Sequence, residues 1–418
     1  MPVQLPAFAA FKDSSLDVME LHASMLDTDP FLAARDEEFW TEIRAAFSLH
    51  PGLINLNNGG CSPSPRVVAE SLKRQIDYAN QGPSIYMWRT LDPVIEKVRT
   101  RLAKLLDTDP EEVAITRNAS ESLITCLQGL PMSPGDELLT TSQDYPRMIN
   151  TILQREKRDG IKMVRVDVPL APQTSEEVVE AIEKGITSRT RMILASHVSF
   201  MTGEIFPIKK ICALGTSRGI PVVVDGAHAV AHFDFSLNEI GCDYYGTSLH
   251  KWLMAPVGTG MLFVKKHLIE PLWALMPNEV SQYGDIRKFE EIGTHQAAVH
   301  NAIAEALDFH EMIGIERKAA RLHYLKSRWS NQVSELAKVR FHTNLKDGHS
   351  GSVCSVEVEG IKGPHLAEWL ESEHRIVVAP IENPQFQGIR VSPQIYTTSD
   401  EVDRFADAIR EAAQVGIG

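Results

Sequence analysis

Residues 221–228 read Pro221-Val222-Val223-Val224-Asp225-Gly226-Ala227-His228, a short apolar run that ends in a carboxylate, a glycine and a histidine. A continuous apolar run is typical of a strand covered on both faces, as in a parallel sheet. Open α/β sheets bind their ligands at the carboxyl ends of such strands. Asp225 could there face a cationic ring nitrogen and keep it protonated, or it could cap the helix that follows.

A second stretch, from Tyr244 to Val264, carries no charged side chain except that of Lys251. Burial lowers the pKa of a lysine and frees its amine to attack a carbonyl carbon. Ser248 and His250 stand next to Lys251 and are polar groups suited to a phosphate. The alternative is a lysine that buries only its stem and extends its ammonium group into water.

Further short apolar runs flank these two stretches, and segments with helical spacing separate most of them. The expected strands cover residues 113–116, 137–141, 163–168, 191–195, 221–224 and 260–264, and the expected helices cover 67–78, 94–106, 120–130, 176–186 and 208–218. This alternation predicts an α/β protein with a mainly parallel sheet.

The pattern changes after about residue 310, where short strands accompany two helices. Residues 353–358, 376–379 and 389–392 read as strands, and 365–373 as a helix. The last helix opens with Thr398-Ser399-Asp400-Glu401, the pattern of a capping box. We therefore predict three parts: an N-terminal helical segment (1–50) that packs with the small domain, a large domain (51–309) and a small α+β domain (310–418).

Composition and charge narrow the class of protein. The 418 residues are 43% hydrophobic and 23% charged, with a net charge of −13, which is typical of a soluble globular protein. A negative charge of this size argues against nucleic acid or an anionic membrane as the main partner. No apolar stretch is long enough to span a bilayer.

The five cysteines are scattered and form no Cys-x-x-Cys pair, so a reducing cytoplasm is the expected location. Residues 1–11 lack the basic and apolar regions of a secretory signal, although a signal already removed would leave the same sequence. The sequence also lacks the Gly-x-Gly-x-x-Gly, P-loop, His-Glu-x-x-His and Gly-x-Ser-x-Gly motifs.

Taken together, Asp225 at a strand end and Lys251 in Ser-x-His-Lys, about 26 residues later, form the arrangement that pyridoxal 5′-phosphate requires. The two motifs resemble those of the class V aminotransferase family within fold type I, and the branch like isopenicillin N epimerase in particular. The resemblance runs from about Leu53 to the C-terminus. It implies a large cofactor domain with a mainly parallel seven-stranded sheet, and a small C-terminal α+β domain.

The resemblance also implies roles for residues around the cofactor. Lys251 matches the Schiff-base lysine, and Asp225 matches the partner of the pyridine nitrogen. His228 matches the residue that contacts the phenolic oxygen of the cofactor. Ser248 and His250 match ligands of its phosphate.

Three further cofactor contacts follow from the same resemblance. The turn Arg117-Asn118-Ala119-Ser120 resembles the phosphate loop, with Ala119 limited to its backbone N–H and Ser120 offering a hydroxyl; Ser120 could equally be a helix N-cap. Tyr145 matches the ring that stacks on the pyridine face, or is a half-buried turn residue. Thr294 matches the threonine that reaches the phosphate of a neighbouring subunit, which implies a homodimer with shared active sites, or it caps the next helix.

Two residues are implied to bind the substrate carboxylate. Arg390 resembles the small-domain arginine of the family, and its planar bidentate donor suits a carboxylate; the alternative is a surface arginine paired with Glu382. Asn58, in Asn57-Asn58-Gly59-Gly60, is the candidate second contact, although a plain Asn-Gly turn explains it nearly as well.

Departures from the family pattern narrow the reaction. Phe200 replaces an asparagine that would touch the cofactor, and residues 378–389 hold no cysteine where desulfurases carry their nucleophile. The prediction is therefore an enzyme that acts at Cα of an amino acid through an external aldimine, first an epimerase or racemase, with an aminotransferase or a C–S or β-eliminating lyase as alternatives. Tyr145 is the candidate acid on the face opposite Lys251. Remote alternatives are a zinc metallohydrolase that uses Asp225, His228 and His232, and a binding protein without catalysis.

Overall fold

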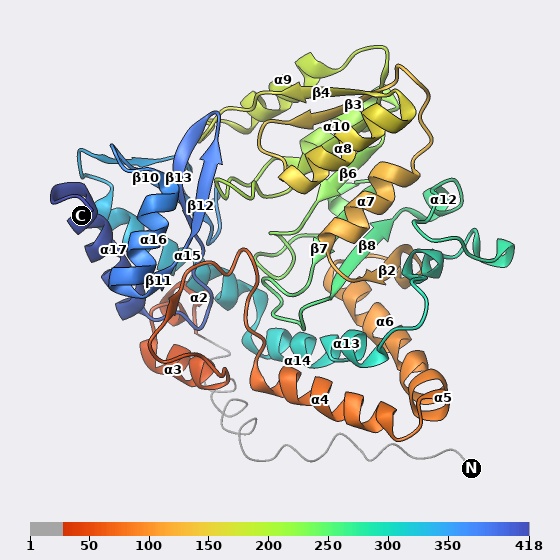
Figure 1. Ribbon diagram of the computed structural model, residues 1–418, viewed down its shortest axis with the longest axis horizontal. Coiled ribbons are helices and arrows are strands. Elements are labelled where there is room, and N and C mark those ends of the chain that lie inside the picture. The colour runs from red at the N-terminus through yellow and green to blue at the C-terminus, as the bar shows by residue number, and fades with distance from the viewer. Residues whose placement is uncertain (1–27, 418) are drawn as a thin grey trace.

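The computed structural model describes residues 28–417 and is built around a seven-stranded sheet (Figure 1). Its strands, in the order β2-β8-β7-β6-β5-β3-β4, are parallel except for β8, which runs antiparallel to both of its neighbours. The bounds are β2 (Val113–Thr116), β3 (Glu137–Thr141), β4 (Lys162–Val166), β5 (Thr190–Ser196), β6 (Val222–Asp225), β7 (Tyr244–Ser248) and β8 (Gly260–Val264). The predicted fold type I architecture is confirmed. Each strand that was expected in this large sheet begins and ends within two residues of its predicted bounds.

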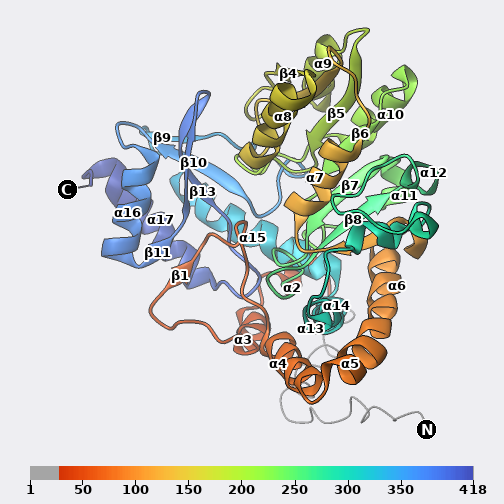
Figure 2. The same ribbon diagram turned by 45° about the vertical axis from the view of Figure 1, so that its right-hand side comes forward.

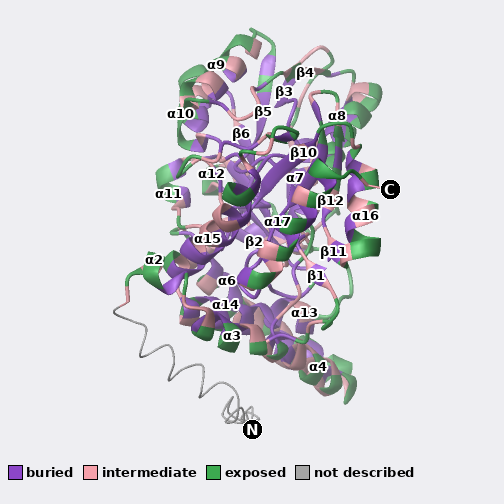
Figure 3. Ribbon diagram, turned by 90° about the vertical axis from the view of Figure 1, so that its left-hand side faces the viewer, coloured by how far each residue is buried: buried purple, intermediate pink, exposed green. Residues whose placement is uncertain are grey.

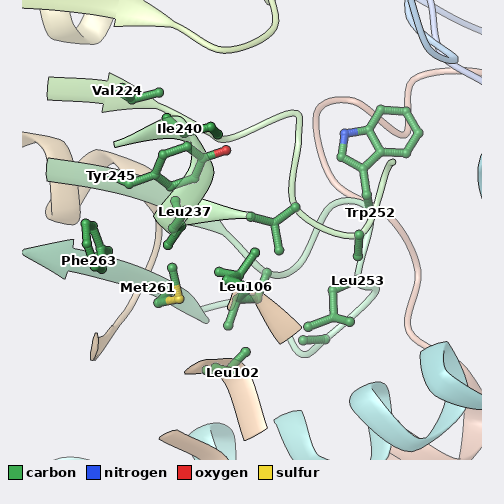
Figure 4. Packing of buried hydrophobic residues seen from close by; sticks show 14 of the residues in the cluster. Leu102, Leu106, Val224, Leu237, Ile240, Tyr245, Trp252, Leu253, Met261 and Phe263 are labelled. Atoms are coloured by element: carbon green, nitrogen blue, oxygen red, sulfur yellow. The ribbon is translucent and has the colours of Figure 1, made fainter. Parts of the chain in front are cut away.

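Helices cover both faces of this sheet, which explains its continuous apolar runs. On one face lie α7 (Ala119–Gly129) and α8 (Pro146–Asp159), whose apolar residues share a core with Val223. On the other face lie α6 (Ile95–Leu105), α9 (Ser175–Gly185) and α10 (Ile208–Arg218), in one core with Val222 and Val224 (Figure 4). Successive strand residues point to opposite faces, so every residue of β6 is buried.

Strand β7 is the element of the large sheet for which the sequence analysis named no strand. Its residues include Gly246, and a Cβ at that position would lie 2.9 Å from the side chain of Leu123 on α7. A Cβ on Gly260 of β8 would lie 2.5 Å from the Cα of Asn118. The two glycines therefore let α7 and its N-cap residue lie against β7 and β8.

A second sheet follows towards the C-terminus, and Figure 2 shows it beside the large sheet with α15 between them. Its four antiparallel strands, in the order β12-β13-β10-β9, are β9 (Val339–Phe341), β10 (Cys354–Val358), β12 (Ala379–Asn383) and β13 (Phe386–Val391). The helices that pack with this sheet are α15 (Ile315–Val333), α16 (Gly363–His374) and α17 (Ser399–Gln414), whereas α14 (Ile303–Ile313) packs in the core of the large sheet. The predicted capping box at Thr398 and Glu401 is present at the start of α17.

The N-terminal part of the described chain packs against this second sheet and its helices. Strand β1 (Ile54–Asn55) pairs in parallel with β11 (Ile376–Val377), α2 (Pro30–Ala33) contacts α15, and Arg44 of α3 (Glu37–Ala45) pairs with Glu401 at 2.8 Å. Residues 1–27 of the predicted helical segment lie outside the described residues. The division of the chain at residues 50 and 309 stays a prediction.

The remaining α-helices pack around the large sheet. Figure 3 shows the sheets and the inner faces of the helices as the buried part of the molecule. They are α4 (Arg66–Asn80), α5 (Pro83–Ile85), α11 (Leu237–Ile240), α12 (Lys266–Ile269) and α13 (Ala297–Asn301). No helix within residues 28–417 has the length and apolar character needed to cross a membrane.

Candidate active site

The predicted site residues gather where the central parallel strands end. Strand β6 ends at Asp225 and β7 ends at Ser248, and the register pairs Asp225 with Gly246 on one side and with Ser196 on the other. Because parallel strands end on the same edge of the sheet, the turns that follow carry their polar side chains to one place.

The amine of Lys251 lies against a histidine. Its Nζ is 3.2 Å from Nε2 of His228, so the side chain turns inward and does not extend to water. Burial lowers the pKa of Lys251 to about 8, helped by the positive charge of Arg390 and opposed by Asp225. Burial also holds the pKa of His228 well below its usual value, and its Nδ1 is buried with no hydrogen-bond partner among residues 28–417.

Asp225 is a buried carboxylate with little to stabilise its charge. It is 7% exposed and accepts one hydrogen bond, from the backbone N–H of Ala227 at 3.0 Å. Burial raises its pKa to about 6, and the nearby Lys251 opposes the rise. The alternative role as a helix cap is wrong, because a turn follows Asp225 and the next helix, α11, begins at Leu237.

The phosphate turn opens a helix, as expected, but its cap is another residue. The side chain of Asn118 accepts the N–H of Glu121 at 2.9 Å and caps α7, so the alternative reading of Ser120 as the N-cap is wrong. The N–H of Ala119 donates to Oγ of Ser248 at 2.9 Å, which joins the turn to the end of β7. This contact brings two of the predicted phosphate ligands together at a helix N-terminus, where an anion is favoured.

His250 has a fixed hydrogen-bond partner on one side. Its Nδ1 lies 3.1 Å from the carbonyl oxygen of Thr259, and because a carbonyl only accepts, Nδ1 carries a proton. Burial and the charge of Lys251 lower the pKa of His250, so the ring is neutral and Nε2 carries no proton. It can donate to a phosphate from Nε2 only after it takes up a second proton.

The structure brings Arg390 to the site, and the asparagine that contacts it is Asn57, not Asn58. Arg390 donates to the carbonyl oxygen of Phe200 at 3.0 Å and to Oδ1 of Asn57 at 2.9 Å; the alternative pairing with Glu382 is wrong. Asn58 is 0% exposed, and its amide bonds to Asn55, Ser392 and Tyr396. The structure does not support Asn58 as a substrate contact, since its hydrogen bonds are used within the protein.

Tyr145 and Thr294 are placed differently from each other. Tyr145 precedes α8, is 40% exposed and packs edge-on against Phe200 with ring centroids 5.2 Å apart, so it lies on the side of the site that holds Arg390. Thr294 is exposed and makes no hydrogen bond to another predicted site residue within residues 28–417. It does not cap a helix either, because Gln296 occupies the N-cap position of α13.

The metallohydrolase alternative is wrong for a structural reason. The Nε2 of His232 accepts the backbone N–H of Ser352 at 2.7 Å, and its Nδ1 lies 2.8 Å from the carbonyl oxygen of His228, so neither nitrogen is open to a metal. Within residues 28–417 no group of three or more His, Cys, Asp or Glu side chains could hold a metal ion.

Two residues that sequence reasoning missed lie at the site. Cys61 is exposed, its Sγ is 3.7 Å from the carbonyl oxygen of His250, and Lys251 opposes the rise in its thiol pKa that burial causes. Asp144 is buried beside Asp225, whose pKa it raises, and Ser196 and Thr140 each donate to it at 2.7 Å. The position of Cys61, directly after the Asn57–Gly60 turn, was a signal in the sequence that it could lie at the site. No feature of the sequence indicated that Asp144 packs beside Asp225.

The charges of the site call for anions. Neither Lys251 nor Arg390 pairs with a carboxylate by direct contact within residues 28–417, and Asp225 is the carboxylate whose charge acts on Lys251. A phosphate and a substrate carboxylate would compensate this excess positive charge, and a ring cation would compensate Asp225. The orphaned Nδ1 of His228 adds an unused donor or acceptor. The residues present therefore fit pyridoxal 5′-phosphate with a bound amino acid.

Comparison with known proteins agrees with this geometry. The profile of the family Aminotransferase class-V matches residues 54–405. Two isopenicillin N epimerases are similar along nearly the whole chain: that of Amycolatopsis lactamdurans is 30% identical over 90% of this chain and 99% of its own, and that of Streptomyces clavuligerus is 29% identical over 88% and 97%. A hercynylcysteine sulfoxide lyase of Schizosaccharomyces pombe is 25% identical over 78% and 85%.

Solved structures show the same fold. An apo cysteine desulfurase of Thermococcus onnurineus aligns with a TM-score of 0.78 at 21% identity over 90% of this chain and 98% of its own. The cystine C–S lyase C-DES, in complex with its product cysteine persulfide, aligns with a TM-score of 0.77 at 22% identity over 86% and 97%. The chain therefore belongs to the class V aminotransferase family, the fold type I enzymes that depend on pyridoxal 5′-phosphate.

Proposed function

We propose that the protein is an epimerase or racemase that inverts Cα of an amino acid or of an amino-acid-derived substrate. The observation that carries the proposal is the meeting of Lys251, Asp225 and Arg390 at one edge of the sheet, in a chain that is about as long as the isopenicillin N epimerases it resembles. The similarity to two such epimerases favours inversion over the other reactions of the family.

The cofactor would be held by residues already in place. Lys251 would bond its aldehyde carbon, Asp225 its ring nitrogen and His228 its phenolic oxygen, while Ala119, Ser120, Ser248 and His250 would bind its phosphate. When bound, the protonated pyridine ring withdraws electrons from Cα and makes its hydrogen acidic. The raised pKa of Asp225 reflects a carboxylate buried without a cation, which a protonated ring nitrogen would supply.

The protein's own groups would then move one proton. Arg390 holds the substrate carboxylate and so fixes the position of Cα. Lys251, whose pKa of about 8 leaves an appreciable fraction of free amine near neutral pH, takes the proton from Cα as general base. Tyr145 is our candidate for the acid that returns a proton to the opposite face, because it stands beside Phe200 and Arg390.

A lyase is the second candidate, and two observations favour it. A hercynylcysteine sulfoxide lyase and a probable L-cysteine desulfhydrase of Arabidopsis thaliana are each 25% identical to this chain. The thiol of Cys61 also lies near Lys251, although no cysteine occupies residues 378–389. An aminotransferase is the third candidate, on family membership alone.

One experiment separates the three reactions. The purified holoenzyme is incubated in D2O with L- and D-amino acids and followed by NMR and chiral chromatography. An epimerase exchanges the Cα hydrogen and produces the enantiomer or epimer. Formation of a keto acid that keeps the β-substituent contradicts epimerisation in favour of transamination, and release of a β-substituent with pyruvate contradicts it in favour of elimination. The Lys251→Ala variant is expected to remain folded and inactive, and borohydride should fix the cofactor to Lys251 of the wild type.

We also infer a homodimer with shared active sites. Thr294 is exposed on its own chain, as a residue that serves the partner's phosphate would be. Exposed apolar side chains lie on the chain before Thr294 and on the π-helical segment Tyr86–Leu91 that follows α5. They include Trp88, Trp273, Leu275, Met276 and Val280. Light scattering of the holoenzyme should give twice the mass of the chain.

All five cysteines are free, which supports a reducing compartment such as the cytoplasm.

A further inference from the structure

We propose that Asn57 positions the guanidinium of Arg390 and so sets how strongly the site prefers a substrate with a free carboxylate. The inference rests on the proposed function, in which Arg390 binds that carboxylate. It concerns a residue in the loop after β1, far from Arg390 in sequence and in contact with it in space.

Arg390 is a buried cation that two neutral oxygen atoms orient. It is 7% exposed, with Nη1 bonded to the carbonyl oxygen of Phe200 and Nη2 to Oδ1 of Asn57. No carboxylate within residues 28–417 pairs with it, and its Nε is buried without a partner. Since a guanidinium has five N–H groups, three remain for a ligand. Which of them face the ligand depends on the two oxygen atoms that hold the others.

Asn57 is itself held in place from three sides. Its N–H donates to Oδ1 of Asn55 at 3.1 Å, its carbonyl oxygen accepts the N–H of Gly60 at 3.1 Å, and its backbone forms a parallel bridge with Ser392. Ser392 stands two residues after Arg390, so the loop and the arginine are tied to the same stretch of chain. The Nδ2 of Asn57 has no acceptor within the described residues and is available to donate to the same carboxylate.

The neutral charge of Asn57 matters as much as its position. An aspartate there would have the same shape, would pair with Arg390 and would cancel the charge that attracts the substrate carboxylate. An alanine would remove one charge-assisted hydrogen bond and would leave the cation. The affinity for a carboxylate should therefore fall from Asn57 to Ala and further to Asp, although Asp resembles Asn more closely.

The test uses two probes that differ only in the carboxylate. Holoenzyme is titrated with 2-aminoisobutyrate, which has no hydrogen on Cα, and with its carboxamide, and binding is read from the visible absorbance of the cofactor. The wild type should prefer the acid. Asn57→Ala should lose roughly tenfold in affinity for the acid, the size of one charge-assisted hydrogen bond, and Asn57→Asp should lose more, while the amide binds all three equally. Asn331→Asp, at an exposed position of α15, carries the same charge change and should behave as the wild type.

The outcomes separate the inference from the function on which it rests. An Asn57→Asp enzyme that keeps the wild-type preference for the acid overturns the inference, and so does an equal loss for acid and amide, which would indicate a structural role. Unchanged absorbance of the unliganded variants confirms that the cofactor pocket is intact. If Arg390→Gln keeps the preference for the acid, the role of Arg390 in the proposed function fails first.

Discussion

The Nζ of Lys251 lies 3.2 Å from Nε2 of His228, and the carbonyl oxygen of that histidine is bonded to His232. His232 accepts the N–H of Ser352 at Nε2, so its proton is on Nδ1, which donates to the carbonyl oxygen of His228 at 2.8 Å. A fixed tautomer of one buried histidine thus connects the residue beside the reactive amine to the segment before β10. The chemistry at Lys251 depends on both parts of the chain.

The lowered pKa of Lys251 predicts how the cofactor attaches. With a pKa of about 8, about a tenth of the amine is free at pH 7, so the rate of attachment to apoenzyme should rise with pH and level off above about pH 9. Stopped-flow absorbance measures this rate. Arg390→Gln removes a neighbouring cation and should move the profile to higher pH, whereas Arg340→Gln, at an exposed site, should not. A wild-type rate that still climbs at pH 10 would contradict the lowered pKa.

The raised pKa of Asp225 predicts a conflict between stability and function. Its pKa is about 6 in the folded apoenzyme and 3.8 in a free chain, so its contribution to stability is full below about pH 4 and is lost as pH rises through 6. Asp225→Asn should therefore raise the free energy of unfolding of the apoenzyme at pH 7.5 by about 1–3 kcal/mol, and should lower kcat by roughly a hundredfold or more.

Urea unfolding of the two apoenzymes between pH 5 and 8 checks this prediction, because the difference should grow with pH. Asp234→Asn, at an exposed position, is the matched control and should change little. An Asp225→Asn apoenzyme that is less stable than the wild type at pH 7.5 would show that the carboxylate is stabilised in a way the structure does not contain.

Gly226 is predicted to be intolerant of any side chain. A Cβ at this position would lie 2.0 Å from the ring of Tyr245, whose hydroxyl lies 2.9 Å from Nδ1 of His197. Gly226→Ala should cost about 1–3 kcal/mol or more and displace Asp225, with weaker cofactor binding. Gly284→Ala, where no atom would lie within 4 Å of the added Cβ, should leave the free energy of unfolding unchanged when both variants are unfolded in urea. Equal stability of the two variants would refute the packing argument.

Shared active sites predict complementation between two defective chains. Lys251→Ala should be inactive, and Thr294→Ala should be weak when cofactor is limiting. A mixed dimer of the two has one site that lacks both residues and one complete site, so activity should appear on mixing and subunit exchange. Mixing Lys251→Ala with Asp225→Asn should restore nothing, because those residues serve the same site from the same chain. Failure of the first pair after proven exchange would argue against sharing.

Much of the fold was predictable because burial leaves a local pattern in the sequence. The runs that became β2, β3 and β6 are apolar throughout, since helices cover both faces of the sheet. Strand β7 was not, because Gly246 and Ser248 serve the contact with α7 and the site. Its polar residues read as a binding segment, and the structure shows that they form a strand.

The candidate site was predictable where a residue follows a strand and less so where loops meet. Asp225 and Lys251 could be named from their motifs, because strand ends carry ligand contacts. The alternative readings of Ser120 and Thr294 as helix caps are wrong, because Asn118 and Gln296 hold the N-cap positions. A cap is decided by backbone angles over one or two residues, which composition does not specify.

The sequence by itself determined the family, the layered sheet and the cofactor, and it predicted Lys251 and Asp225 as the two residues that we propose define its chemistry. Only the tertiary structure decided that Asn57 and not Asn58 touches Arg390, and that Cys61 lies beside His250. Apolar patterning and motifs act over a few neighbouring residues and can be read along the chain. The choice between two adjacent polar side chains depends on which of them meets a strand more than 300 residues away, and the packing of the two sheets makes that choice.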